Sequence, residues 1–184
     1  MENQKNQTQQ IILNNGLILG FVSILLSVSI YALGLIYEMK ILFLTLLISL
    51  IIFIVFIVVG IKQFKKINSG FLSLSESIKI GLGIALISGI MSITYNIIFT
   101  TFLEPEYEKN MILVSEQWTY ETFNLPDEAF EKLQEENREK IENFEVNHFT
   151  NIAKGLSFSL FSGLIISLIA GLFMRKSQEN PYTN

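Results

Sequence analysis

The sequence has no cysteine, one histidine and three prolines among its 184 residues. Without cysteine the chain can form neither a disulfide, nor a thiolate metal site, nor a cysteine nucleophile. The single histidine, His148, excludes a metal site that is built from several histidines. The sequence also contains no recognisable catalytic triad motif, phosphate-binding glycine loop or metalloprotease helix. We therefore expect no catalytic residue, no cofactor and no bound metal, and a protein that is not an enzyme.

Charge is scarce and unevenly distributed. Only 16% of the residues are charged, against about a quarter in a typical soluble domain. The segment 104–146 holds 13 of the 17 acidic residues, together with four basic ones. The chain has a net charge of −4 and lacks the concentrated basic surface that binding phosphates requires. Nucleic acid is therefore not expected as a partner.

Four long apolar runs occupy most of the chain. They cover residues 11–37, 41–61, 80–103 and 152–174, and the only charge within them is Lys154, near the start of the fourth. About 20 apolar residues cross the hydrocarbon core of a bilayer as a helix. The sequence thus predicts an all-α integral membrane protein, one membrane domain over 1–184 with four transmembrane helices. Residues 1–10 are polar and expected to be flexible, and no signal-peptide cleavage site follows.

The third connection, 104–148, is predicted to be an acidic extramembrane segment. The sequence Asn124-Leu125-Pro126-Asp127 is typical of a helix start. Apolar residues then recur three or four positions apart, which predicts an amphipathic helix over 127–147 with a narrow apolar face. That face offers a surface to the top of the bundle or to a protein partner through Phe130, Leu133, Ile141 and Phe144.

Small residues form stripes along spans one, three and four. In membranes such residues let helix backbones approach closely, and we assign helix packing to Gly16, Gly20, Gly81, Ala85, Gly89, Gly155, Ser159 and Gly163. Span two has few small residues, so we expect it to face lipid on most sides while the other three form a tight core. A stripe of this kind can also line a water path or join two copies of the chain.

Few polar groups lie near the spans. Asn96 and Tyr95 are the deepest pair apart from hydroxyls; we favour an interhelical hydrogen bond and an interfacial aromatic over a substrate pocket. Ser73 and Glu76 fit the capping-box pattern, which predicts a helix start there. Glu76 and Lys79 are one turn apart, and we expect a local ion pair between them.

Basic residues near span ends predict the orientation. The connection after span two and the tail after span four hold five of them, Lys62, Lys65, Lys66, Arg175 and Lys176. Lys and Arg close to span ends are retained in the cytoplasm. We therefore expect both termini in the cytoplasm and 104–148 outside it.

Several short motifs occur in a characteristic order. They are Asn15-Gly16, Gly60 with Ser69-Gly70-Phe71, Glu76-x-x-Lys79-x-Gly81, Tyr95-Asn96-Ile97-Ile98 and Leu103-Glu104-Pro105. With this order and spacing, the chain resembles the domain-of-unknown-function family numbered 4199, common in Bacteroidota. The resemblance implies an integral protein of the bacterial inner membrane. It brings no activity and no site residues.

Two functions from different classes follow. The first is a non-enzymatic interaction or assembly protein in contact with membrane lipid, whose acidic helix meets a protein partner or a second copy. The alternative is a small transporter or channel that works as an oligomer, with the polar stripes of spans three and four along its path. No ionisable residue lies at the centre of any span, which argues against proton coupling in that alternative.

Overall fold

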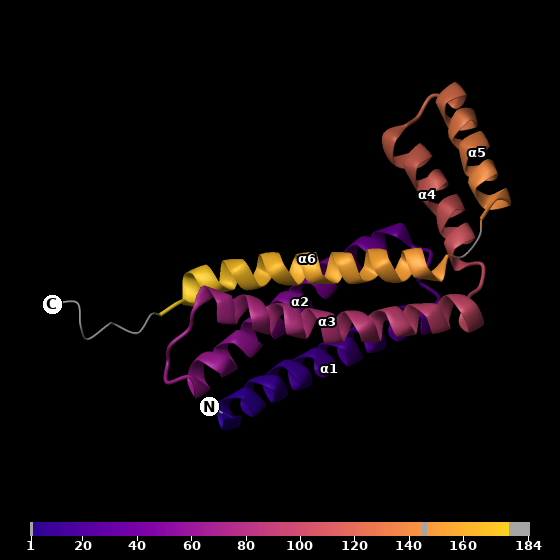
Figure 1. Ribbon diagram of the computed structural model, residues 1–184. Helices are drawn as coiled ribbons and strands as arrows, with labels where there is room; N and C mark the ends of the chain where they lie inside the picture. Colours follow the sequence, from indigo (N-terminus) through magenta and orange to yellow (C-terminus); the bar gives the residue numbers. More distant parts are fainter. Residues whose placement is uncertain (1, 145–146, 177–184) are drawn as a thin grey trace.

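A computed structural model describes residues 2–144 and 147–176, and over these ranges the chain is helical (Figure 1). The long helices are α1 (Glu2–Ala32), α2 (Met39–Ile67), α3 (Leu74–Ile98) and α6 (His148–Met174). A π-helical segment η1 (Phe99–Leu103) extends α3, and α4 (Tyr107–Phe123) and α5 (Asp127–Glu142) follow. The four long helices form a bundle, and α4 and α5 form a hairpin at one end of it. We call this the hairpin end and the opposite end, where α1 begins and α6 stops, the terminal end.

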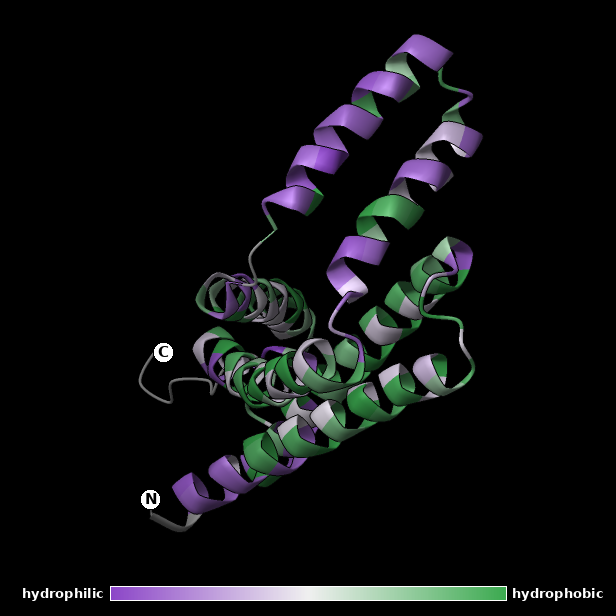
Figure 2. Cartoon of the chain, turned by 90° about the vertical axis from the view of Figure 1, so that its right-hand side faces the viewer, coloured by the Kyte–Doolittle hydropathy of each residue, from purple (hydrophilic) through white to green (hydrophobic). Residues whose placement is uncertain are grey.

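The four long helices are long and apolar enough to cross a membrane. Their outer surface is unusual for a soluble protein, because many large apolar side chains are exposed on it, and these helices are coloured mostly as hydrophobic in Figure 2. Phe102, Phe149 and Phe173, for example, are between 77% and 88% exposed. Such a surface is stable in lipid, because apolar side chains that contact lipid tails carry no hydrophobic free-energy penalty. The predicted all-helical class with four candidate spans is thus confirmed, and the chain is compatible with a multi-pass membrane protein.

Helix α3 is the centre of the bundle, with α1 and α6 packed along different faces of it. Span two was expected to face lipid on most sides, and in the structure only the first half of α2 lacks buried residues. In its second half, α2 supplies Ile57, Ile61 and Phe64 to the buried core cluster. These side chains pack beside Ile80 and Ile84 of α3 because Gly60, on the same face of α2, lets the two helices approach.

Helix boundaries differ from the sequence prediction at several ends. Helix α1 ends at Ala32 rather than at 37, because Gly34 adopts φ +70° and the Leu35 amide then donates to the carbonyl of Ile30, which closes the helix. The polar residues before span one, expected to be flexible, belong to α1 from Glu2 onward. The predicted capping box at Ser73 is confirmed, with reciprocal hydrogen bonds between Ser73 and Glu76.

The acidic segment contains two helices where one was predicted. Helix α5 begins at Asp127, as the Pro126-Asp127 signal indicated, but it ends at Glu142 rather than at 147. Helix α4 was not predicted, because its apolar and polar residues alternate without a clear helical stripe. Asn124 closes α4 in the left-handed conformation, with φ 48°, and turns the chain back so that α5 runs antiparallel to α4.

Candidate functional site

The eight small residues predicted to pack helices lie at two seams on α3. At the first seam, Gly81, Ala85 and Gly89 face α6. A side chain on Gly81 would meet the Cβ of Ser167, and its Cβ would lie 3.3 Å from the carbonyl oxygen of Gly163. Ser159 joins the two helices through its hydroxyl, which donates to the Ala85 carbonyl at 2.8 Å.

Small residues also lie against the neighbouring helix in the rest of this seam and in the second seam. Gly155 of α6 lies against Ile93, whose Cγ1 would be 3.0 Å from an added Cβ. At the second seam, Gly16 and Gly20 of α1 face Ile87 and Met91 of α3, where added Cβ atoms would come within 2.7 Å and 2.6 Å of side-chain atoms. Side chains of the neighbouring helix thus fill the space beside these glycines.

The bundle is not packed equally along its length. The buried residues of α2 are Ile57, Gly60, Ile61 and Phe64, and those of α6 are Gly163, Ser167, Ala170 and Gly171. All of them lie in the second half of their helix, toward the terminal end. The first halves of α2 and α6 contribute no buried residue among those described. The two helices therefore leave a space between them in the hairpin-end half of the bundle.

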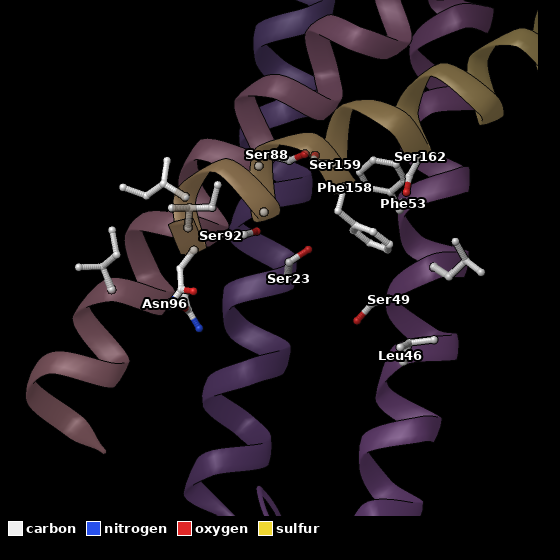
Figure 3. Close-up of a pocket in the computed structure, with 17 residues that line it drawn as sticks. Ser23, Leu46, Ser49, Phe53, Ser88, Ser92, Asn96, Phe158, Ser159 and Ser162 are labelled. Carbon is white, nitrogen blue, oxygen red and sulfur yellow. The ribbon is translucent and has the colours of Figure 1, made fainter. Parts of the chain in front are cut away.

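This space is a groove of about 530 Å³, which we call the serine groove (Figure 3). All four long helices line it, and no ionisable side chain is among its lining residues. The polar side chains are Ser23, Ser49, Ser88, Ser92, Asn96, Asn151, Ser159 and Ser162. Apolar residues at its rim are the more exposed ones: Leu46 is 61% and Phe158 74% exposed, whereas Ser88 is 4% exposed. The groove is therefore an uncharged site with an apolar rim.

Apart from Asn151, which donates to Glu108, the polar side chains of the serine groove fall into two classes. Ser23, Ser88 and Ser159 donate to backbone carbonyls of the bundle at 2.9, 3.2 and 2.8 Å. The side chains of Ser49, Ser92, Asn96 and Ser162, by contrast, have no hydrogen-bond partner within residues 2–144 and 147–176. The interhelical hydrogen bond expected for Asn96 is thus not formed, because α2 and α6 have diverged at its level.

An aromatic cluster lies at the hairpin end, around η1. The ring of Phe99 contacts those of Tyr31, Tyr95 and Tyr107, with centroid distances of 5.2, 5.9 and 5.3 Å. Tyr95, expected at the membrane interface, therefore packs inside this cluster. A second cavity of about 140 Å³ lies beside these rings and shares Asn96 with the serine groove. A π-helical turn is often found at functional sites, because it shifts side chains out of helical register.

Hydrogen bonds attach the base of the hairpin to the bundle. The Tyr37 hydroxyl donates to a carboxylate oxygen of Glu104 at 3.0 Å and accepts from the Asn110 amide at 3.1 Å. Burial and the neighbouring Glu104 raise the pKa of the Tyr37 hydroxyl above its ordinary value, so it stays protonated and able to donate. The Asn151 amide donates to Glu108 at 3.2 Å, which joins α6 to α4.

Helix α4 covers the predicted partner face of α5. The rings of Tyr120 and Phe130 are 4.2 Å apart, and the buried Asn137 amide donates to Glu116 at 3.0 Å. The other residues of that face are half-buried: Leu133, Ile141 and Phe144. No bundle helix packs along α5 in the part of the chain that the structure describes. The apolar face therefore holds the hairpin together, and the charged face remains outside.

The charged face of α5 is almost entirely unpaired. All seven of its acidic residues are exposed, and the described hairpin segment 104–144 holds twelve acidic and four basic residues, a net charge of −8. Lys132 and Glu128 form the one ion pair among the described residues, at 3.3 Å. An exposed pair of this kind contributes little to stability. Repulsion among the remaining carboxylates leaves this surface ready to bind positive charge.

The terminal end of the bundle is basic, whereas the hairpin is acidic. The Lys65 ammonium donates to the carbonyl of Met174 at 2.7 Å, and thus compensates the negative end of the α6 dipole. Lys176 pairs with Leu72 through two backbone hydrogen bonds of 3.0 Å. The expected Glu76–Lys79 ion pair is wrong, since the Glu76 carboxylate binds the Ser73 amide and hydroxyl of the capping box, each at 2.7 Å.

One buried polar contact was missed in the sequence. Asn15 is 4% exposed, and its amide donates at 2.8 Å both to the Ile11 carbonyl and to the Gln63 side chain. The adjacent amides Asn14 and Asn15 lie inside the apolar run 11–37. They could have indicated this contact, because a polar group in a membrane helix needs a hydrogen-bond partner.

The chain was compared with protein families, curated proteins and solved structures. The sequence model of a family described as "Protein of unknown function (DUF4199)" matches residues 14–176. No curated protein and no solved structure matches the chain. The match covers every motif on which the resemblance rested, and that resemblance is confirmed.

Proposed function

Since the chain belongs to the DUF4199 family of proteins of unknown function, we propose its function from its own geometry: a non-enzymatic, multi-pass membrane protein whose acidic hairpin α4–α5 binds a partner rich in Lys and Arg. The observation that carries this proposal is the charged outer face of α5. Its seven acidic residues are exposed, and only Glu128 has a cationic partner among the described residues.

The construction of the hairpin supports a docking role. Phe130 of α5 packs against Tyr120 of α4, and the hairpin stands beyond the bundle with α5 built mostly of hydrophilic residues (Figure 2). Its base is fixed by the Tyr37–Glu104 and Asn151–Glu108 hydrogen bonds and by the contact of Trp118 with Phe43, 5.4 Å between centroids. A fixed, charged projection attracts an oppositely charged partner and orients it on arrival.

We also propose that the protein lies in a bacterial inner membrane with both termini in the cytoplasm. The basic residues Lys62, Lys65, Lys66, Arg175 and Lys176 gather at the terminal end, and the positive-inside rule places such an end in the cytoplasm. The hairpin would then meet its partner on the extracytoplasmic side.

Crosslinking in cells tests the docking role. A photo-crosslinking amino acid at Glu139, exposed on α5, should capture a polypeptide through a Lys- and Arg-rich segment identified by mass spectrometry. The triple variant Glu131→Gln, Glu135→Gln, Glu142→Gln should lose the product, and raised salt should weaken it by screening.

A matched control removes the same charge elsewhere. Glu38, Glu106 and Glu121 are exposed but lie outside α5, whose outer face is the proposed contact, and their replacement by Gln should leave the product intact. A product that survives neutralisation of α5, or one that contains only a second copy of this chain, would contradict the proposal.

One observation favours the alternative, an oligomeric transporter or channel. The polar residues of α3 and α6 do line a groove, at Ser92, Asn96 and Ser162. Within one subunit, however, the groove meets the packed core around Ile61 and Ile84 toward the terminal end. Solute flux into proteoliposomes that is abolished by Asn96→Ala would support this alternative. If no solute flux depends on Asn96, the docking role is the better account.

A further inference from the structure

The serine groove holds polar groups that the protein itself does not satisfy. Ser49, Ser92 and Ser162 can each turn a hydroxyl toward a carbonyl of their own helix. Asn96 can return at most one amide N–H to a carbonyl of its own helix, as Asn15 does to Ile11, and its second N–H and its amide oxygen would still lack a partner. Its side chain has no partner within the described residues. Asn96 is exposed on the protein itself, and in the hydrocarbon of a bilayer an amide without a partner costs free energy, so the groove favours an occupant that hydrogen-bonds Asn96.

The chemistry of the groove restricts this occupant. No lining side chain is ionisable, so a charged group would be buried here without compensation. Most of the wall is hydrocarbon, from residues such as Leu50, Phe53, Ile93 and Ile97. The volume of about 530 Å³ lies within the range of about 300–1,000 Å³ typical of small-molecule sites. The occupant is therefore a largely apolar molecule with an uncharged hydrogen-bonding group.

The position of the groove indicates where the occupant comes from. The rim residues Leu46 and Phe158 face outward, on the first halves of α2 and α6, where neither helix is buried. Each of these halves belongs to a candidate span, so the opening between them faces the hydrocarbon of a bilayer. Asn96 lies about two turns before Leu103, roughly 10 Å from the hairpin end. That depth is close to the polar part of a bilayer lipid.

We propose that the serine groove binds one neutral membrane lipid. Its hydrocarbon chain enters between α2 and α6, and its uncharged hydroxyl or carbonyl group hydrogen-bonds the amide of Asn96, with Ser92 one turn away on the same face of α3. Figure 3 shows the side chains of Asn96, Ser92, Ser23 and Ser49 around the space that the lipid would fill. Among the described residues, the groove touches the hairpin only through Asn151, which bonds Glu108, and the lipid site does not rest on the docking role.

Photo-labelling of the whole chain in nanodiscs tests the site. The probes are a diacylglycerol with a photoactivatable chain, which is neutral, and a phosphatidic acid with the same chains, which is anionic. Labelled peptides are located by mass spectrometry. We expect the neutral probe to label groove residues of α2 and α6, and the anionic probe to label them at least tenfold less.

Variants separate the groove from the general lipid surface. The pair Ser92→Leu with Asn96→Leu fills the groove and should reduce labelling there about tenfold. Asn96→Ala leaves the space open and removes the hydrogen bond, which should reduce it about two- to tenfold. Thr94→Leu, on the exposed face of the same helix, should change nothing. Thermal unfolding in detergent shows whether each variant is folded.

Three results would overturn the proposal. Equal labelling of the groove by both probes would mean that charge is not excluded. Labelling that Asn96→Ala leaves unchanged in a folded protein would mean that the amide recognises nothing. A crosslink between two copies of this chain through Leu46 or Phe158, at the expense of lipid, would assign the opening to a dimer interface instead.

Discussion

Single small side chains determine how closely the helices of this bundle approach. Gly81 and Gly163 face one another across the α3–α6 seam, and a Cβ on either would lie 3.3 Å from the carbonyl oxygen of the other. A carbonyl oxygen is part of a rigid helix, so it cannot move aside as a flexible side chain can. The seam therefore tolerates only the smallest residues, and separation of the two helices is the response to any larger one.

Replacement of Gly81 by Leu should lower the free energy of unfolding by about 1–3 kcal/mol, the usual range for overpacking. Equilibrium unfolding in detergent measures this. The matched control is Thr94→Leu, an exposed position on the same helix, with an expected change below about 0.5 kcal/mol. Equal stability of Gly81→Leu and the control would show that the seam does not hold α3 against α6.

The buried amide pair Asn15 and Gln63 is the second residue-scale feature. Their 2.8 Å hydrogen bond joins α1 to α2 beside the core. A double-mutant cycle with Asn15→Ala and Gln63→Ala should give a coupling of about 0.6 kcal/mol and at most about 1.7, the range found in membrane bundles. Asn15→Ala combined with Thr45→Ala, at the far end of α2, should give none. If both cycles give a coupling free energy of the same size, the hydrogen bond between Asn15 and Gln63 does not stabilise the bundle specifically.

At the scale of elements, the hairpin is a unit with its own small core. Helix α5 is strongly charged and touches α4 through Phe130 and Asn137, while α4 contacts the bundle through Trp118 and Phe43. Because so few contacts cross to the bundle, the hairpin should open without unfolding the four long helices.

Tyr120→Ala should loosen the hairpin selectively. Loss of the ring contact with Phe130 removes about 1 kcal/mol or more, so amide hydrogen exchange in α5 should rise at least about fivefold. Exchange in α3 should stay unchanged. Phe123→Ala, at an aromatic residue of α4 that is 64% exposed, should have a smaller effect on α5. If both variants raise exchange equally, α4 does not cover α5 as described.

The elements also show what the sequence could and could not predict. Spans, the capping box at Ser73 and the start of α5 were predictable, because each depends on residues close together in the chain. The apolar residues of α4 form no clear helical stripe, and its partner α5 comes later in the chain. The pairing of α4 with α5 could therefore not be inferred from the sequence. The serine groove depends on where α2 and α6 diverge, which is set by packing between distant residues such as Gly60 and Ile84. The polar residues of α3 were predictable; the space in front of them was not.

For the whole molecule, charge divides the chain into two ends. The hairpin carries a net charge of −8 over 104–144, and the terminal end carries a cluster of lysines and one arginine. Between them lies an apolar belt of four helices. Moving charged side chains across the hydrocarbon core of a membrane costs free energy. This division, rather than any single residue, is the basis of the proposed topology and of the proposed partner on the acidic side.

The absence of cysteine makes this topology directly measurable, since one introduced thiol is the only one that reacts. Three single variants, Glu135→Cys on α5, Lys66→Cys at the terminal end and Leu47→Cys on the first half of α2, are treated with a membrane-impermeant maleimide in spheroplasts. All three positions are exposed on the protein itself. We predict that Glu135→Cys is labelled at once, that Lys66→Cys is labelled only after the membrane is broken, and that Leu47→Cys reacts only in detergent. Labelling of Glu135→Cys and Lys66→Cys together in intact spheroplasts, or of Leu47→Cys in intact membranes, would contradict the four-span account.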